Sequence, residues 1–259
     1  MFRQRFLAAL IFSLAPALVF AQDKFFDSFG VSIRYVDQGA GEPVILLHGI
    51  GGTLEQVLRP ALLDALGLTS HYRVLGFDAR GHGKSGKPHD PAMYGPEMGL
   101  DVVRLMDHLG IARAHVVGYS MGAATVTQLL TLRPERILSA TLVGGAGYFA
   151  TTPEVERSME QQAMERERDG TEGGRAMAAL LRGAAPLSPA QVAAVKVPIL
   201  GVSGSLDPYL SPMREVKKIR PDMTLPVVEG ATHGAILREV QATSAIRDFI
   251  ASHRQSPAH

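Results

Sequence analysis

The sequence predicts an α/β fold, in which a mostly parallel β-sheet is flanked by helices, and two patterns indicate it. Six short runs rich in Val, Ile and Leu are bounded by glycine, at residues 43–49, 72–79, 114–120, 138–147, 197–205 and 224–230. Continuous apolar runs, unlike alternating ones, are typical of parallel strands that are covered on both faces. Helical periodicity fills the intervals between the runs, so strands and helices alternate, which favours right-handed crossover connections.

The first and last elements depart from this pattern in a predictable way. Residues 25–39 alternate between apolar and polar and contain Gly30, which predicts an antiparallel hairpin at the edge of the sheet. Pro96 opens a helix. The face of this helix that we expect to be buried comprises Met98, Val102, Leu105 and Leu109. In a second predicted helix, near the C-terminus, we expect one face to carry Ile236, Val240, Phe249 and Ile250.

One interval, from residue 150 to about residue 195, contains no strand-like run. Its first half is dense in Glu and Arg, and an alanine-rich and leucine-rich half follows. We therefore expect a helical excursion from the sheet. Two interpretations stay open: a solvated segment with no direct role, or a short helical lid over the sheet.

The N-terminus has the layout of a secretory signal peptide at residues 1–21. Two arginines precede an apolar stretch of 16 residues, Phe6 to Ala21, which Ser13 and Pro16 interrupt. A membrane span needs roughly 20 apolar residues, so an uncleaved anchor is disfavoured. We expect cleavage after Ala21 and export to the periplasm or the medium. One domain, residues 22–259, then has no stable membrane insertion.

Composition excludes several functional classes. The chain has 26 Lys and Arg against 25 Asp and Glu, and removal of residues 1–21 takes away two arginines, so 24 remain against 25 and the net charge becomes −1. A nearly neutral balance disfavours a nucleic-acid partner. The absence of cysteine excludes disulfides and thiol catalysis. No histidine pair has metal-ligand spacing on a helix, so neither a metal nor another cofactor is expected. The oligomeric state stays open.

Ser120 is the candidate nucleophile. It stands between two glycines in HVVGYSMGA, at the carboxyl end of the run 114–120. Ligands of parallel α/β sheets gather at the carboxyl ends of the strands. Flanking glycines let the backbone turn sharply there and lift the serine above the sheet. Because a serine hydroxyl is a weak nucleophile at neutral pH, it needs a base, and the base needs an orienting acid.

His233 and Asp207 are the predicted base and acid. At a strand–turn–helix nucleophile the partners follow in the order serine, acid, histidine. Only three histidines follow the helical interval, and two of them, His253 and His259, lie in the C-terminal tail. Asp207 and His233 each come directly after a predicted strand, at the same edge as Ser120. Asp222 competes as the acid, but it precedes a strand and belongs to the opposite edge.

The oxyanion of a tetrahedral intermediate needs preorganised donors. The backbone N–H of Met121, at the start of the helix after Ser120, is one candidate, and the N–H of Ile50, in the loop after the run 43–49, is the other. His48 precedes this loop. We expect His48 to brace the loop rather than to act as a base.

Together these motifs resemble the α/β-hydrolase superfamily, specifically its small single-domain esterase-like members. The resemblance covers about residues 30 to 250 and is carried by LLHGIGG, FDARGHGKSGKP, YGPEMGLDVVRLMDHLGI, HVVGYSMGA, GSLDP and GATH. It implies the α/β-hydrolase fold with a short lid, and a role for Asp78 and Arg80 in pinning a loop. The site residues that it implies agree with those above: Ser120, Asp207 and His233 as the triad, and Ile50 and Met121 as the oxyanion donors.

The expected function is that of a serine hydrolase that cleaves carboxylic esters of small molecules through an acyl-enzyme. Two other enzymatic interpretations use the same triad: hydrolysis of a carbon–carbon bond in a diketone-like acid, and cofactor-free perhydrolysis of a short carboxylic acid. A binding or receptor protein with little turnover is the alternative from a different class. The short lid favours short or medium acyl groups.

Overall fold

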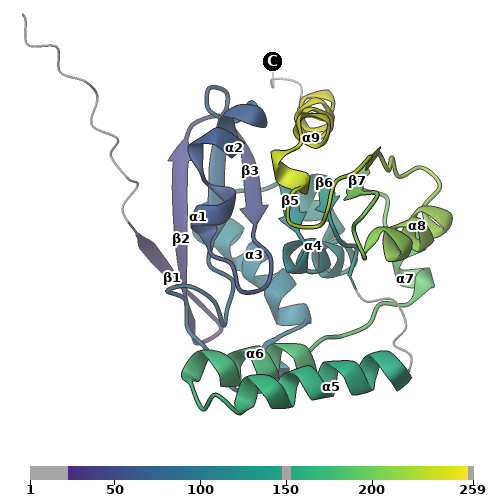
Figure 1. Ribbon diagram of the computed structural model, residues 1–259. Helices are drawn as coiled ribbons and strands as arrows, with labels where there is room; N and C mark the ends of the chain where they lie inside the picture. Colours follow the sequence, from purple (N-terminus) through teal and green to yellow (C-terminus); the bar gives the residue numbers. More distant parts are fainter. Residues whose placement is uncertain (1–22, 148–152, 256–259) are drawn as a thin grey trace, which may run out of the picture.

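The structure is a computed structural model, and it describes residues 23–147 and 153–255 (Figure 1). The predicted signal peptide, residues 1–21, lies outside the described residues. In the described part of the chain, no helix is long and apolar enough to cross a membrane.

Eight strands form one sheet in the order β1-β2-β4-β3-β5-β6-β7-β8. The strands are β1 (Lys24–Ser28), β2 (Val31–Gly39), β3 (Glu42–Leu47), β4 (Tyr72–Phe77), β5 (Ala114–Tyr119), β6 (Ile137–Val143), β7 (Ile199–Gly204) and β8 (Val227–Val228). β2 pairs antiparallel with β1 and with β4, and the remaining neighbours are parallel. The mostly parallel sheet and the antiparallel hairpin at its edge are therefore confirmed.

Helices connect the strands and cover the sheet (Figure 1). They are α1 (Leu54–Val57), α2 (Pro60–Ala65), α3 (Pro96–His108), α4 (Met121–Leu132), α5 (Pro153–Glu167), α6 (Glu172–Arg182), α7 (Pro189–Ala194), α8 (Leu210–Ile219) and α9 (Val240–Ser252). Three 3-10 turns, η1 (Pro91–Met93), η2 (Pro134–Arg136) and η3 (Ile236–Arg238), complete the described elements.

The apolar core forms two layers, one on each face of the sheet. Ile45 of β3 packs in the layer shared with α3, α4, α7 and α8, whereas its neighbour Val44 packs in the layer shared with α1, α2 and α9. Both side chains are fully buried. Successive residues of a strand point to opposite faces, so a strand covered on both faces must be apolar at every position. This explains the continuous runs seen in the sequence.

The last predicted strand is shorter than its apolar run suggested. Of residues 224–230, β8 contains only Val227 and Val228, with an isolated bridge between Thr224 and Leu200. The N–H of Thr224 donates to the carbonyl of Ile199, at 3.3 Å, but the next donor along the ladder is Pro226, which has no N–H. Proline interrupts a strand for this reason.

The helix at Pro96 is confirmed as α3, and three of its four expected core residues are fully buried or nearly so. The prediction for the C-terminal helix was wrong in part. Val240 is 78% exposed, and Ile236, although buried, lies in the separate turn η3. Glu239 adopts an extended backbone between η3 and α9, which breaks the helical register. The buried residues of α9 are Ala242, Thr243, Ile246 and Ile250.

The interval from residue 150 to 195 contains α5, α6 and α7. Figure 1 shows α5 and α6 as an antiparallel pair across the end of the molecule toward which the arrow of β3 points. Ala179 and Leu180 of α6 pack against Tyr94 and Met98, and Met121 borders the same apolar cluster. Helix α6 therefore shares an apolar cluster with the residue that follows Ser120.

Candidate active site

Ser120 lies in the turn between β5 and α4, and its backbone is held in an unusual conformation. Its φ is +54° and its ψ is −113°. Among the described residues, only Phe29 is another non-glycine with positive φ. Both flanking positions require glycine because a side chain would not fit there. A Cβ on Gly118 would collide with the backbone of Gly122, and a Cβ on Gly122 would lie 2.5 Å from the carbonyl oxygen of Leu47. This strained turn raises the hydroxyl above the sheet edge.

The structure brings Ser120, His233 and Asp207 together from three different loops. Nε2 of His233 is 3.0 Å from Oγ of Ser120, and Nδ1 of His233 is 3.0 Å from Oδ2 of Asp207. The carboxylate of Asp207 can only accept, so Nδ1 carries the proton and Nε2 is left to accept the serine O–H. The Asp207 side chain is fully buried, and its Oδ1 accepts the N–H of Tyr209 at 2.9 Å.

Asp222, the competing acid, lies elsewhere. Its carboxylate pairs with Arg220 at 2.6 Å, and its side chain is 62% exposed. Arg220 lowers the pKa of Asp222 to about 2. Asp222 therefore forms a surface ion pair and does not reach His233.

The two predicted oxyanion donors face no protein acceptor. Met121 is the first residue of α4, where an N–H has no partner within the helix. Within residues 23–147 and 153–255, neither this N–H nor that of Ile50 donates a hydrogen bond to the protein. The Ile50 loop lies directly against Ser120, since a Cβ on Gly49 would be 3.2 Å from Cβ of Ser120. Two unused donors thus flank the serine, an arrangement that can receive a developing negative charge.

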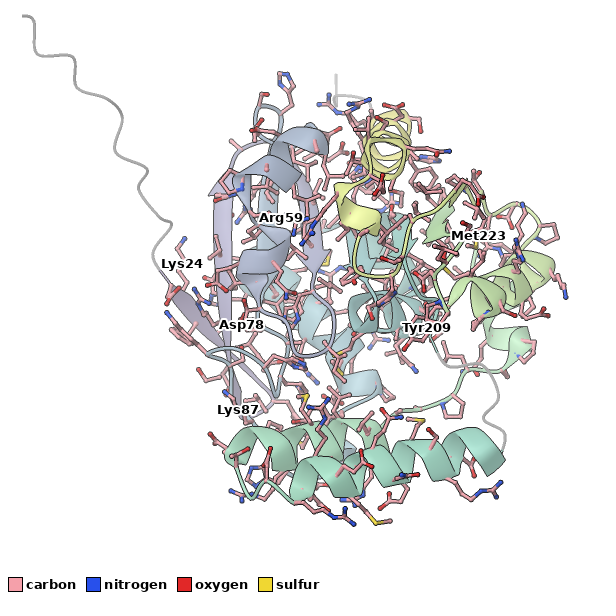
Figure 2. The ribbon with its side chains drawn as sticks, in the orientation of Figure 1. Lys24, Arg59, Asp78, Lys87, Tyr209 and Met223 are labelled. Carbon is pink, nitrogen blue, oxygen red and sulfur yellow. The ribbon has the colours of Figure 1, made fainter. Side chains whose placement is uncertain are left out.

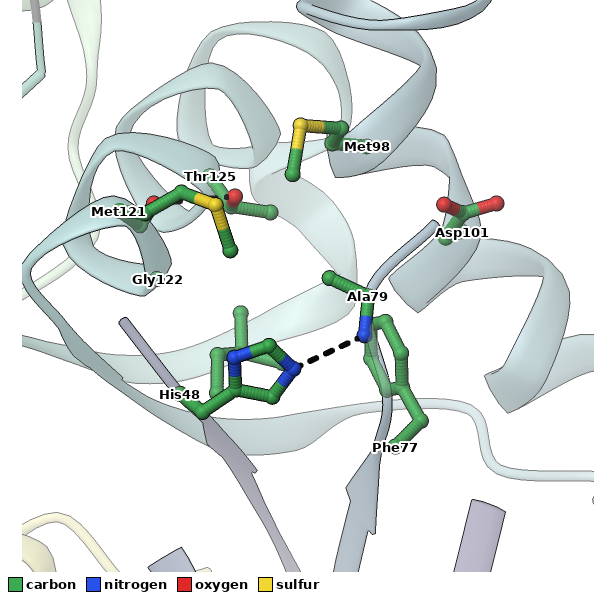
Figure 3. Close-up of a pocket in the computed structure, with 9 residues that line it drawn as sticks. His48, Phe77, Ala79, Met98, Asp101, Met121, Gly122 and Thr125 are labelled. Carbon is green, nitrogen blue, oxygen red and sulfur yellow. Dashed lines mark hydrogen bonds between the residues drawn. The ribbon is translucent and has the colours of Figure 1, made fainter. Parts of the chain in front are cut away.

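Both ring nitrogens of His48 form hydrogen bonds with the backbone, and Figure 3 shows the one to Ala79. Its Nε2 accepts the N–H of Ala79 at 3.0 Å, so Nδ1 carries the proton and donates to the carbonyl of Gly49 at 2.8 Å. Burial lowers the pKa of His48, which favours this neutral form. The side chain connects the Ile50 loop to the end of β4, as expected of a brace.

Asp78 and Arg80 form buried networks beside the same loop. Asp78 accepts the N–H of Leu54, which starts α1, and the N–H of Lys84, each at 2.8 Å. Arg80 binds Asp101 of α3 through two hydrogen bonds of 2.6 and 2.7 Å, and both side chains are almost fully buried. Figure 2 shows Asp78 on the side of the molecule that carries the hairpin β1–β2. These contacts pin α1 and the segment after β4, as the resemblance implied.

A small cavity lies beside the Ile50 loop, between α3, α4 and the ends of β3 and β4 (Figure 3). Its volume is about 10 Å³, enough for roughly one water molecule and not for a substrate. In the described part of the chain, no group of three or more His, Cys, Asp or Glu could hold a metal ion.

Three residues around His233 were missed by the sequence reasoning. The ring of Tyr119 stacks on the imidazole with centroids 5.1 Å apart, and the centroid of Tyr209, the residue before α8, lies at 5.0 Å. Gly144, with φ of +60°, passes so close that a Cβ would be 3.0 Å from Nδ1 of His233. Only the position of Tyr119, next to Ser120, offered a signal in the sequence.

Comparisons with known proteins agree with the fold. A model of the alpha/beta hydrolase fold family matches residues 42–172. A dihydrolipoyllysine-residue acetyltransferase component of the acetoin cleaving system of Cupriavidus necator is 40% identical over 129 residues, 48% of this chain and 32% of the relative. The 2-hydroxy-6-oxo-6-phenylhexa-2,4-dienoate hydrolase of Comamonas testosteroni is 39% identical over 134 residues, 47% of this chain and 44% of the relative. The chain thus matches less than half the length of these curated relatives.

Among solved structures, the enol-lactonase from Burkholderia xenovorans LB400 superposes with a TM-score of 0.69 and 26% identity. The superposition covers 88% of this chain and 100% of the lactonase chain. The likeness therefore covers a larger share of the chain than the family model, which matches residues 42–172.

Proposed function

This chain belongs to the alpha/beta hydrolase fold family, and we propose that it is a serine hydrolase that cleaves carboxylic esters of small molecules. The observation that carries the proposal is the hydrogen-bonded series from Asp207 through His233 to Ser120, with both distances at 3.0 Å. The unused N–H groups of Ile50 and Met121 beside Ser120 support it. Neither a metal nor another cofactor takes part in the proposed steps.

The proposed reaction is acyl transfer to water. Nε2 of His233 takes the proton of Ser120 while Oγ attacks the ester carbonyl, and the new oxyanion is received by the N–H groups of Ile50 and Met121. The intermediate expels the alcohol, which leaves with the proton from His233. His233 then deprotonates a water molecule that attacks the acyl-enzyme, and it returns this proton to Oγ of Ser120 as the acid is released. Asp207 holds the imidazole in the correct tautomer throughout.

Ester cleavage is supported by the enol-lactonase likeness, since a lactone is a cyclic ester. A second candidate, hydrolysis of a carbon–carbon bond, is favoured by the Comamonas hydrolase, whose name describes a dienoate substrate. In both reactions a bond between an acyl carbon and its leaving group is broken. The leaving atom is oxygen in an ester and carbon in the second candidate, and the same triad could catalyse either cleavage. We propose that α5 and α6 act as the short lid, because α6 belongs to an apolar cluster against which Met121 packs, and α5 packs on α6.

The first experiment is active-site titration with a fluorophosphonate probe, together with turnover of p-nitrophenyl acetate, butyrate and octanoate. We expect one equivalent of label on Ser120 and rapid turnover of the shorter esters. Ser120→Ala should lower kcat by on the order of 10⁴ or more. Ser252→Ala, on the exposed side of α9, is the matched control and should retain activity.

The other interpretations predict different outcomes of this experiment. Labelling with slow ester turnover but rapid cleavage of a vinylogous 1,5-diketone acid would identify a carbon–carbon hydrolase. Peroxide-dependent formation of a peracid from acetate would identify a perhydrolase, and labelling with negligible turnover of every substrate would favour a receptor. No labelling of Ser120 would refute the serine mechanism.

We also propose that the protein is exported, on the layout of residues 1–21 alone. Mass spectrometry of the N-terminus of the protein purified from its native cells should find Gln22 as the first residue. A mature protein that retains residues 1–21 would contradict export by cleavage.

A further inference from the structure

Tyr119 contacts two of the loops that carry the candidate site and directly precedes the third component, Ser120. Its hydroxyl donates to the backbone carbonyl oxygen of His233 at 3.0 Å, across 114 residues of sequence. Its ring stacks on the His233 imidazole, with centroids 5.1 Å apart and planes 26° apart. On the opposite side of the site, a Cβ built on Gly49 would lie 3.1 Å from Cδ1 and Cε1 of the same ring. The Tyr119 side chain thus contacts both the loop that carries His233 and the loop that carries Ile50.

The hydrogen bond from Tyr119 holds its loop at residue 233, the residue that carries the imidazole. His233 lies in the turn between β8 and η3. In residues 153–255 and 23–147, the carbonyl of His233 accepts no hydrogen bond other than that of Tyr119. The separation between Nε2 of His233 and Oγ of Ser120 therefore depends on a contact made by the residue adjacent to Ser120.

The aromatic rings also favour the charge that His233 acquires during the reaction. When Nε2 takes the serine proton, the imidazole becomes a cation. A cation within about 6 Å of an aromatic centroid is attracted by the ring. Tyr119 and Tyr209 both meet this condition, with centroids 5.1 and 5.0 Å from the imidazole. Tyr209 is 47% exposed, whereas Tyr119 is partly buried against the apolar layer of α1, α2 and α9, so Tyr119 is the better fixed of the two.

We propose that Tyr119 is a positioning residue for the base: its side chain ties the His233 loop to the Ile50 loop and to Ser120, and so holds the imidazole in line between Asp207 and Ser120. This inference rests on the proposed function, because it assigns Tyr119 a role in the transfer of the serine proton. The role requires the hydroxyl as well as the ring, since only the hydroxyl reaches the backbone of residue 233.

Two substitutions separate the contributions of the hydroxyl and the ring. Tyr119→Phe removes only the hydroxyl, and we expect kcat to fall about tenfold with KM nearly unchanged, because the loop that positions the imidazole loses one hydrogen bond. Tyr119→Leu removes the ring too, and kcat should fall by about 100-fold, as for a base misplaced by about 1 Å. The control is Tyr35→Phe, which removes a hydroxyl bonded to Nε2 of His108 at 3.2 Å, between β2 and α3.

The rate of fluorophosphonate labelling provides a readout that would not change if Tyr119 contributed only to the stability of the fold. In Tyr119→Phe, the final label should stay at one equivalent while the labelling rate falls in parallel with kcat. Thermal unfolding should differ little between Tyr119→Phe and Tyr35→Phe. Wild-type kcat and labelling rate in Tyr119→Phe, a rise in KM alone, or a reduced number of labelled sites at an unchanged rate would overturn the inference. Failure of the wild type itself to be labelled would instead refute the proposed function, and this role with it.

Discussion

The tightest test of the site geometry is the substitution Gly144→Ala. Gly144 follows β6, and its φ is +60°. A methyl group there would lie 3.0 Å from Cε1 and Nδ1 of His233 and 3.1 Å from Oδ2 of Asp207. Favourable contacts between carbon atoms begin at about 3.5 Å, so the imidazole or the carboxylate must move by roughly 0.5 Å. That movement acts directly on the 3.0 Å hydrogen bond between His233 and Asp207.

The expected magnitude follows from this displacement. A misplacement of about 1 Å costs on the order of 100-fold in rate, so a shift of about half that size should lower kcat by roughly tenfold or more. The left-handed backbone adds a loss of stability of about 1–2 kcal/mol for any residue with a Cβ. Gly144→Ala should therefore lose some stability and a larger share of its activity.

Gly110→Ala is the matched control. Gly110 has φ of +65°, and a Cβ on it would meet nothing within 4 Å. It follows α3, away from Ser120, so it should show the same backbone strain with no loss of kcat. Urea unfolding measures the stability of both variants, and kcat per labelled Ser120 measures activity. Wild-type kcat in folded Gly144→Ala, or equal losses of kcat in both variants, would refute the reasoning.

Three other predictions concern charged and titratable groups. Asp207→Asn should lower kcat by on the order of 10⁴ because the tautomer of the base is lost, whereas Asp222→Asn should leave kcat near that of the wild type; equal effects on ester turnover would contradict the choice of acid. Burial lowers the pKa of His82 from 6.5 to about 4, so His82 binds a proton less readily in the folded state than in the unfolded state. The free energy of unfolding should therefore fall by about 3 kcal/mol as the pH falls from about 6.5 to below 4. Urea unfolding at different pH values should show that His82→Asn loses this part of the decrease in stability. If the pH dependence of the variant equals that of the wild type, other groups cause the decrease. Asp101→Ala should destabilise the fold by about 3–5 kcal/mol, because it leaves the buried Arg80 guanidinium unpaired; a loss in urea unfolding no larger than that of Asp222→Ala would argue against a buried pair.

Local pattern was sufficient for the strands, apart from the length of β8, and for the turn at Ser120. Ile45 and Val44 are adjacent in the sequence and both apolar because each faces a different buried layer, which is a property of one short segment. The turn at Ser120 was predictable because glycines flank it; a Cβ on Gly118 would collide with Gly122, four residues later, whereas the close approach of Leu47 to Gly122 comes from another strand. The meeting of Asp207 and His233 with Ser120 could be predicted as well, because the carboxyl ends of parallel strands share one edge of the sheet.

By itself, then, the sequence determined the α/β fold, the edge hairpin and the candidate serine, acid and base. The tertiary structure alone decided how these groups are held. Tyr119 reaches His233 across 114 residues, and Gly144 approaches the imidazole from yet another strand end. Periodicity records only which face of an element is apolar, within neighbours three or four residues apart. Which side chains meet at the sheet edge is set by the crossovers and by close packing of the assembled layers, so these contacts leave no local pattern.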